Sequence, residues 1–155
     1  MRVLVVSDTH GSPDLLLEAV RHAGHTDALL HLGDGAKDCG ALRSNYGGDI
    51  YQVKGNCDFT PMDANDRMLA LGGAPVYMTH GHMYDVKTTL NRLWFRGREL
   101  QAAVVCFGHT HVPLLNRQGH MLLLNPGSLR YGSTYAVLTI RDGAVDAAMH
   151  SLTEK

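Results

Sequence analysis

Apolar residues in the first third of the chain form short continuous runs separated by a segment with helical spacing. Continuous runs of this length predict strands covered on both faces, and they comprise residues 3–6, 28–32 and 50–53. Between the first two runs, apolar residues line one side of residues 13–23, with Ser12 placed to cap that helix and Gly24 to end it. A shorter helix is expected over residues 38–44. The order of these elements predicts a βαβαβ unit.

The second half of the chain has apolar runs joined by turn signals, which favours more antiparallel pairing. Strands are expected over residues 67–71, 76–79, 104–107, 114–116, 121–124, 135–140 and 144–150. Gly72-Gly73 between the first two indicates a hairpin. Residues 88–99 have the spacing of a helix that covers a sheet, with Trp94 and Phe95 on its packing face. Gly97 weakens the last turn of this predicted helix.

Length and composition predict one soluble globular domain over residues 1–155, because 45% of the residues are apolar and 19% are charged. The formal net charge of -1 and the scattered basic residues argue against long nucleic acids and membrane surfaces as partners, and favour a small ligand. No secretory or membrane-spanning run is found, so the expected location is the cytoplasm. The three cysteines have no C-x-x-C spacing and are expected as free thiols. The oligomeric state is open, and a homo-oligomer is compatible with the sequence.

Polar residues with metal-binding side chains stand just beyond the ends of five predicted strands. They are Asp8, His10, Asp34, Asn56, His80, His109 and His111. Taken alone, Asp8 and His10 fit an Asx turn and an exposed histidine equally well. Together the seven form an oxygen and nitrogen set without sulfur, which suits first-row transition metals better than Ca or Mg. Seven ligands are too many for one ion but suit two ions sharing a carboxylate, for which Asp34 is the best candidate.

These residues lie in five blocks that resemble, in order, those of the calcineurin-like metallophosphoesterases, and especially their small bacterial and archaeal phosphodiesterase branch. The blocks are Asp8-Thr9-His10, Gly33-Asp34, Gly55-Asn56-Cys57-Asp58, Thr79-His80-Gly81-His82 and Gly108-His109-Thr110-His111. The resemblance implies one metal bound by Asp8, His10 and His111, a second bound by Asn56, His80 and His109, and Asp34 bridging them. It also implies an α/β fold, a four-layer α/β/β/α sandwich of two mixed β-sheets flanked by helices. The strand pattern alone is equally compatible with a three-layer sandwich.

The expected activity is hydrolysis of a phosphodiester by a metal-bridging hydroxide, since two divalent ions lower the pKa of a shared water from about 15.7 to about 7. Manganese is the expected metal, with Ni, Fe, Co or Zn as alternatives. Where the wider family has a histidine that assists the leaving group, this chain has Cys57. Either His82 then supplies the proton, or the substrates have acidic leaving groups. Cys57 is a candidate catalytic residue, but a small buried filler is an equally simple interpretation.

Other polar residues have plainer explanations. His31 fits a hydrogen-bonded histidine in the core, and four more are expected at the surface: His22, His25, His120 and His150. Arg96, Arg98 and Arg130 are candidate phosphate contacts, which a solvated face explains equally well. Residues 125–128 form a turn that either approaches the metals or is purely structural. The alternatives to a phosphodiesterase are a non-catalytic scaffold on the same fold, and a phosphomonoesterase or short-oligonucleotide nuclease.

Overall fold

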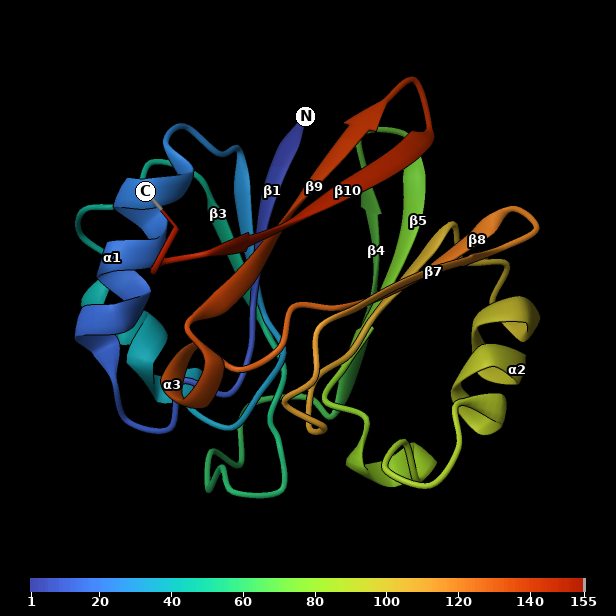
Figure 1. The fold of residues 1–155 in the computed structure, drawn as a ribbon, viewed down its shortest axis with the longest axis horizontal. Helices are drawn as coiled ribbons and strands as arrows, with labels where there is room; N and C mark the ends of the chain where they lie inside the picture. The colour runs from blue at the N-terminus through green and yellow to red at the C-terminus, as the bar shows by residue number, and fades with distance from the viewer. Residues whose placement is uncertain (155) are drawn as a thin grey trace.

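Two five-stranded sheets pack face to face, and helices cover the outer side of each (Figure 1). The computed structural model describes residues 1–154. The first sheet contains, in spatial order, β10 (Ala144–Ser151), β9 (Thr134–Arg141), β1 (Arg2–Val6), β2 (Ala28–His31) and β3 (Asp49–Gln52). The second contains β4 (Asp66–Leu71), β5 (Ala74–Thr79), β6 (Val104–Cys106), β8 (Met121–Asn125) and β7 (Leu114–Gln118). The four-layer fold implied by the family resemblance is therefore confirmed.

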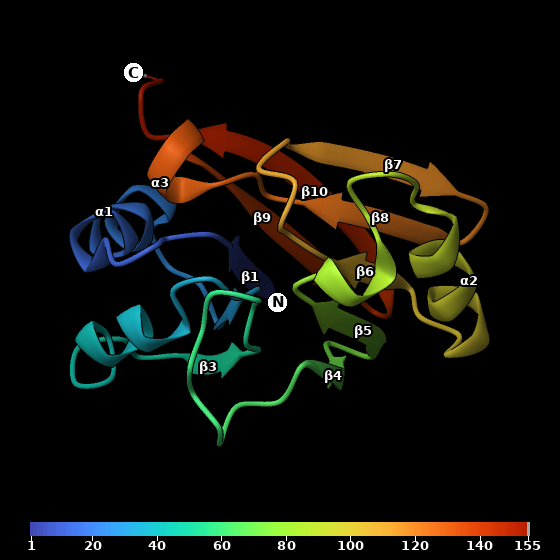
Figure 2. The same cartoon turned by 90° about the horizontal axis from the view of Figure 1, so that it is seen from below.

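Helices lie on opposite sides of this sandwich, as the views in Figures 1 and 2 agree. They are α1 (Pro13–Ala23), α2 (Asn91–Glu99), the single turn α3 (Leu129–Gly132), and the 3-10 helices η1 (Ala36–Ala41) and η2 (His82–Tyr84). The first sheet is flanked by α1, η1 and α3, and the second by α2. None of these helices has both the length and the apolar run needed to cross a membrane.

The central strands of both sheets include parallel pairs. β1 pairs in parallel with β2, and β2 with β3, as the predicted βαβαβ unit requires. In the second sheet β5, β6 and β8 are also parallel, and antiparallel β4 and β7 lie at its edges. The strands of the second half that are joined by turn signals pair antiparallel, as predicted, whereas β5 and β6, which are joined across α2, pair in parallel.

Alternate side chains of the buried strands enter different cores. Val3 and Val5 of β1 lie in the apolar layer between the sheets, whereas Leu4 packs beneath α1 on the outer side. In β6, Val104 faces the layer between the sheets and Val105 faces α2. A strand sends successive side chains to opposite faces, so a continuous apolar run is what a strand between two packed layers needs.

Two local predictions for the first half are corrected, and one short element of the second half was not predicted. The Ser12 side chain makes no capping hydrogen bond; instead the Asp38 carboxylate accepts hydrogen bonds from the backbone N–H groups of Gly11 and Ser12. The short helix lies over Ala36–Ala41 rather than residues 38–44, and it is a 3-10 helix. The turn α3 was not predicted at all, because a single helical turn carries no periodic signal.

The covering helix α2 begins later than predicted, at Asn91, and packs differently. Trp94 lies against the core beneath α2 as expected, but Phe95 is 63% exposed, so its assignment to the packing face was wrong. Gly97 is buried, and a Cβ atom there would lie 2.6 Å from Sδ of Met121. This glycine therefore permits close approach of α2 to the sheet, at the expense of helix propensity.

Candidate metal centre

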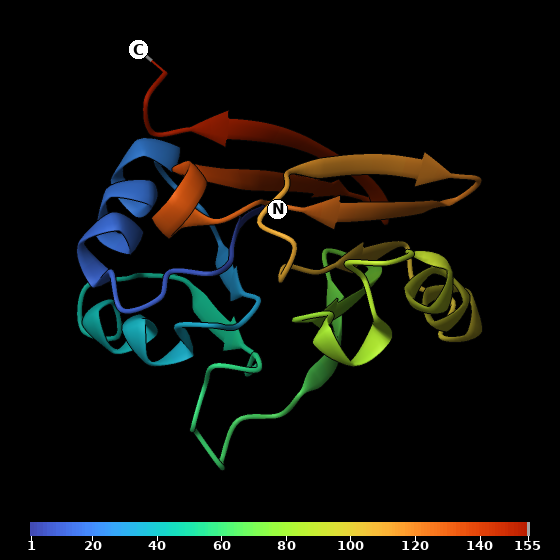
Figure 3. The same cartoon turned by 60° about the horizontal axis from the view of Figure 1, so that its bottom comes forward.

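The loops that follow β1, β2 and β6 hold their metal-binding side chains in an unusual backbone conformation. Five predicted ligands have φ between 45° and 70°, which is the left-handed region: Asp8, His10, Asp34, His109 and His111. Non-glycine residues adopt this region uncommonly and at a cost in free energy, and such strain concentrates at functional sites. Figure 3 shows these loops at the end of the sandwich from which the β3–β4 connection projects.

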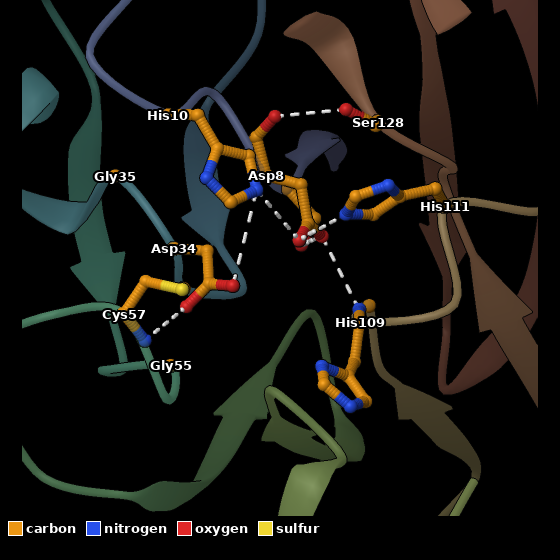
Figure 4. A network of polar contacts seen from close by, with 12 residues as sticks. Asp8, His10, Asp34, Gly35, Gly55, Cys57, His109, His111 and Ser128 are labelled. Atoms are coloured by element: carbon orange, nitrogen blue, oxygen red, sulfur yellow. Dashed lines mark hydrogen bonds and ion pairs between the residues drawn. The ribbon is translucent and has the colours of Figure 1, made fainter. Parts of the chain in front are cut away.

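Asp8, His10 and His111 form a first group, with one ligand atom of each within 4.8 Å of the others. Nε2 of His111 lies 3.0 Å and Nε2 of His10 lies 3.4 Å from Oδ1 of Asp8 (Figure 4). Asp8 is fully buried, and its Oδ2 accepts hydrogen bonds from the Ser7 hydroxyl and from the backbone N–H of His109. The carboxylate is thereby held with Oδ1 facing the two imidazoles.

Asp34, His80 and His109 form a second group on the same criterion. Nε2 of His80 lies 3.3 Å from Oδ2 of Asp34 and 3.2 Å from Nδ1 of His109. Nδ1 of His80 lies 2.8 Å from the carbonyl oxygen of Leu32. Since a carbonyl oxygen only accepts, Nδ1 carries a proton there and Nε2 is left to bind an electrophile.

The titration of the second group follows from its burial and its charges. Burial opposes the charged form of Asp34, but the hydrogen bond and charge of His80 outweigh it and lower the pKa of this carboxyl group. Burial would lower the pKa of His80, yet the contacts with Asp34 raise it. Burial, and then the neighbouring His80, lower the pKa of His109 to about 4. Asp34 is therefore anionic and His109 is neutral at neutral pH, which are the forms that bind metals.

Asp34 lies between the two groups. Its Oδ2, which contacts His80, is also 3.9 Å from Nε2 of His10 in the first group. Its Oδ1 accepts a hydrogen bond of 2.8 Å from the backbone N–H of Cys57 (Figure 4). The side chains of His10, Asp34 and Cys57 form a further set whose ligand atoms lie within 4.8 Å of one another.

Cys57 is exposed, so its interpretation as a small buried filler was wrong. Desolvation and the charge of Asp34 raise the pKa of its thiol, which stays protonated at neutral pH. Asn56 is exposed too, and its amide Nδ2 lies 3.5 Å from Sγ of Cys57. The other six predicted ligands lie in the two groups described above.

His82 follows the second group at the start of η2. Its ring centroid lies 5.5 Å from that of His80 and 6.2 Å from that of His109. Its Nδ1 is buried and has no hydrogen-bond partner within residues 1–154. Burial and the charge of His80 lower the pKa of His82. The ring is therefore mainly neutral at neutral pH, which makes it a weak proton donor there.

Two carboxylates that the sequence left without a role fix these loops, the buried Asp38 and the partly buried Asp58. Asp58 accepts hydrogen bonds from four backbone N–H groups, those of Asp34, Gly35, Ala36 and Gly55. Asp38 accepts from Thr9 Oγ1, which is also 3.0 Å from Nε2 of His31. Nδ1 of His31 accepts from the N–H of Gly33, so this histidine is the hydrogen-bonded core residue that was expected.

The turn at residues 125–128 contacts the loops that carry the predicted ligands, through side chains that bond to backbone carbonyl groups. Asn125 donates from Nδ2 to the carbonyl oxygen of Gly108, next to His109. Ser128 donates from Oγ to the carbonyl oxygen of Asp8 at 2.9 Å (Figure 4). The turn thus ties the loop after β6 to the loop after β1, although it supplies no side chain to either group of ligands.

Of the three arginines that were candidate phosphate contacts, one lies beside the site and two lie on α2. Arg130 lies beside the site, since its backbone N–H donates to the carbonyl oxygen of Asp8. Arg96 pairs with Glu99, and Arg98 stacks over the ring of Trp94, on α2 at the other side of the sandwich (Figure 1). The solvated-face interpretation therefore fits Arg96 and Arg98.

A cavity of about 250 Å³ opens beside Asp34. It is lined by His10, Gly11, Asp34, Gly35, Lys37, Cys57 and Asp58.

The residues present fit a metal pair. His10 Nε2 is buried and has no hydrogen-bond partner within residues 1–154, although it lies between two carboxylates. Metal–nitrogen and metal–oxygen bonds are about 2.0–2.2 Å long, so groups whose ligand atoms lie within 4.8 Å of one another can surround an ion with small adjustments. An ion at each group would also satisfy this orphaned nitrogen.

The chain matches the model of the calcineurin-like phosphoesterase superfamily domain over residues 1–143. A probable metallophosphoesterase of Bacillus subtilis, YsnB, is 35% identical over 150 residues, which cover 93% of this chain and 87% of YsnB. The Escherichia coli K12 phosphodiesterase YfcE is 27% identical over 158 residues, covering 83% of this chain and 79% of YfcE. The crystal structure of a conserved uncharacterized protein of Streptococcus pneumoniae TIGR4, described as a predicted phosphoesterase, superposes with a TM-score of 0.83. That protein is 30% identical, and the match covers 99% of this chain and 91% of its own.

Proposed function

Because the chain belongs to the calcineurin-like phosphoesterase superfamily, we propose that it is a dinuclear metal-dependent phosphoesterase whose substrates are phosphodiesters. The observation that carries the proposal is the position of Asp34. One oxygen of this carboxylate lies 3.3 Å from His80 of the second group and 3.9 Å from His10 of the first. A carboxylate within reach of both groups is what a bridging ligand of two ions requires. The similarity to a protein named as a phosphodiesterase supports the choice of diesters.

In this proposal each group of ligands holds one divalent ion, with manganese as the expected metal. Asp8, His10 and His111 bind the first ion, Asp34 binds both, and His80 and His109 bind the second. Asn56 completes the second set after a rotation of its exposed side chain away from Cys57. When bound, the ions supply Lewis-acid activation of a water molecule and neutralise charge on the phosphoryl group.

The chain's own residues preorganise this chemistry. Asp58 fixes the backbone on both sides of Asp34, and the carbonyl of Leu32 sets the proton of His80 on Nδ1. Preorganised ligands and dipoles need no rearrangement as charge develops in the transition state, which is where electrostatic catalysis gains most. The absence of a protein nucleophile from this scheme is consistent with the raised pKa of the Cys57 thiol.

We propose that the leaving oxygen lies on the side of the site where Cys57 stands, with His82, whose ring centroid is 5.5 Å from that of His80, as the candidate donor. His82 is mainly unprotonated at neutral pH because its pKa is lowered, and the Cys57 thiol is a weak acid because its pKa is raised, so neither group readily donates a full proton there. Of the two sequence hypotheses, this favours substrates whose leaving groups are acidic enough to depart with a hydrogen bond from His82 rather than full protonation.

The test combines metal analysis of the purified protein with a panel of phosphate monoesters and diesters, assayed with added Mn, Ni, Zn and Mg. We expect bound transition metal and a preference for diesters with phenolic leaving groups. Asp34→Asn should abolish activity while the protein remains folded. A protein that binds no transition metal, or retains full activity as Asp34→Asn, would refute the two-metal mechanism; a preference for monoesters would refute the substrate class alone.

A further inference from the structure

Tyr131 of α3 places an exposed aromatic ring against two of the proposed metal ligands. Its ring centroid lies 5.4 Å from that of His111, with 28° between the ring planes, and 5.3 Å from that of His10. The residue is nevertheless 67% exposed. The ring therefore covers imidazoles with one side and presents its other side to solvent at the edge of the site.

The backbone that carries Tyr131 is held firmly. The N–H of Tyr131 donates to Ser128 Oγ at 3.0 Å, and Ser128 Oγ donates in turn to the carbonyl oxygen of Asp8. The preceding Leu129 is fully buried. A tyrosine on a fixed backbone has only two side-chain torsions to restrict, so it loses little conformational entropy when it contacts a ligand.

Tyr131 lies beside the first group of ligands, because its ring contacts both His111 and His10. Figure 4 shows His111 and Cys57 on opposite sides of Asp8, and Tyr131 stacks on His111. With the leaving oxygen on the Cys57 side, as the proposed function has it, a retained ester arm that extends over His111 contacts Tyr131. The hydroxyl of Tyr131 makes no hydrogen bond within residues 1–154 that would hold the ring in another role.

We propose that Tyr131 is a specificity-determining residue that stacks on a planar group of the retained ester arm, so that the protein prefers phosphodiesters in which this arm is a nucleoside or an aryl group. The proposal rests on the proposed function for the position of the phosphate. An exposed aromatic ring accepts bases and other planar rings with little regard to their hydrogen-bonding edges. The preference should therefore extend over different bases.

The direct test is binding of the product by isothermal titration calorimetry with the manganese-loaded protein. Thymidine 5′-monophosphate and ethyl phosphate present the same phosphate with and without a planar group. We expect the nucleotide to bind about 2- to 10-fold more tightly, and Tyr131→Ala, but not Tyr131→Phe, to remove that difference. Equal binding of the two compounds by the wild-type protein, or an unchanged preference in Tyr131→Ala, overturns the proposal.

Kinetics distinguish substrate contact from a positioning role. The p-nitrophenyl diesters of thymidine 5′-phosphate and of ethyl phosphate share one leaving group, so Tyr131→Ala should raise KM for the thymidine ester alone and leave the metal content unchanged. Equal losses on both esters with less bound metal would show that the ring only positions His10 and His111, which overturns the proposal. Phe95→Ala is the matched control, because Phe95 is 63% exposed and lies on α2, far from α3 (Figure 1). If the wild-type protein hydrolyses neither ester, the proposed function fails, and the binding test still decides the role of Tyr131.

Discussion

Asp38→Asn removes one negative charge from a buried position without changing the size of the side chain. Asp38 is 6% exposed, and its Oδ2 accepts three hydrogen bonds. The donors are Thr9 Oγ1 at 2.6 Å and the backbone N–H groups of Gly11 at 3.0 Å and Ser12 at 3.2 Å. These contacts hold the loop that carries Asp8 and His10, where both residues adopt positive φ.

The cost of this substitution follows from the number of bonds weakened. A hydrogen bond to a charged group contributes about 1.5–3 kcal/mol, against about 0.5–1.5 kcal/mol for a neutral pair. Each of the three bonds therefore weakens by about 1–1.5 kcal/mol, so an asparagine that retains all three contacts through its amide oxygen should lower the free energy of unfolding by up to about 3–4.5 kcal/mol. Since partners that orient metal ligands typically affect metal affinity by about 10–100-fold, we expect a loss of that size at the site.

Urea unfolding of the metal-free protein, followed by the fluorescence of Trp94, measures the first effect, and calorimetric titration with Mn measures the second. Trp94 is the one tryptophan of the chain. Asp146→Asn makes the same chemical change at an exposed position and should alter stability by less than about 0.5 kcal/mol. If Asp38→Asn matches this control in both measurements, Asp38 does not hold the loop and the reasoning is refuted.

Three further predictions concern titration, packing and the leaving group. Burial lowers the pKa of His31 from 6.5 to about 4, so below pH 6.5 the unfolded chain binds a proton that the folded chain does not. The free energy of unfolding should therefore fall as the pH drops from 6.5 toward 4, by roughly 3 kcal/mol from this group. His31→Gln should show a smaller drop in Tm between pH 7 and pH 4.5 than the wild-type protein. Equal drops in Tm for the two proteins would contradict the assignment. Gly97→Ala should lower the free energy of unfolding by about 1–3 kcal/mol, because its Cβ would lie 2.6 Å from Met121 Sδ, whereas Gly40→Ala has no atom within 4 Å of its Cβ and serves as the control. Similar unfolding midpoints for these two variants would show that α2 shifts without cost. His82→Ala should reduce kcat for an alkyl phosphodiester about 10-fold or more and spare a phenolic one, and equal losses on both would count against its contact with the leaving oxygen.

The sequence predicted the strands and the chemistry at their ends for a physical reason. A continuous apolar run such as residues 3–6 suits a strand between two packed layers. The side chains on the two faces of this strand indeed pack in two different hydrophobic cores. The polar residue that follows such a strand has to lie at the edge of the sheet. The sequence alone therefore predicts that Asp8 and Asp34 lie at the same end of the first sheet.

What the sequence did not predict depends on contacts between distant segments. The pairing of β9 with β1 and of β8 with β6 determines that there are two sheets, and no local pattern encodes it. Asp38 and Ser128 lie next to the metal-binding loops only because those segments meet in space. Tyr131 was missed for the same reason, since an aromatic residue in a single helical turn carries no periodic signal.

The supporting residues could have been suspected from one feature only. Asp58 belongs to the same sequence block as Asn56 and Cys57. It directly follows Cys57, the residue at the position where the wider family has a histidine that assists the leaving group, so a functional role could have been suspected. Its actual role, accepting backbone N–H groups around Asp34, requires the β2 and β3 loops to be adjacent. Adjacency of neighbouring parallel strands was predicted, but the direction of the side chain was not.

The central claim is that one carboxylate, Asp34, joins two metal ions. Electron paramagnetic resonance of the protein loaded with two equivalents of Mn tests it most directly, because ions about 3.5–4 Å apart that share a carboxylate give a spin-coupled spectrum. We predict this coupled signal for the wild-type protein and its loss in Asp34→Asn. A wild-type spectrum of isolated, uncoupled manganese ions, or a coupled spectrum that persists in Asp34→Asn, would contradict the account.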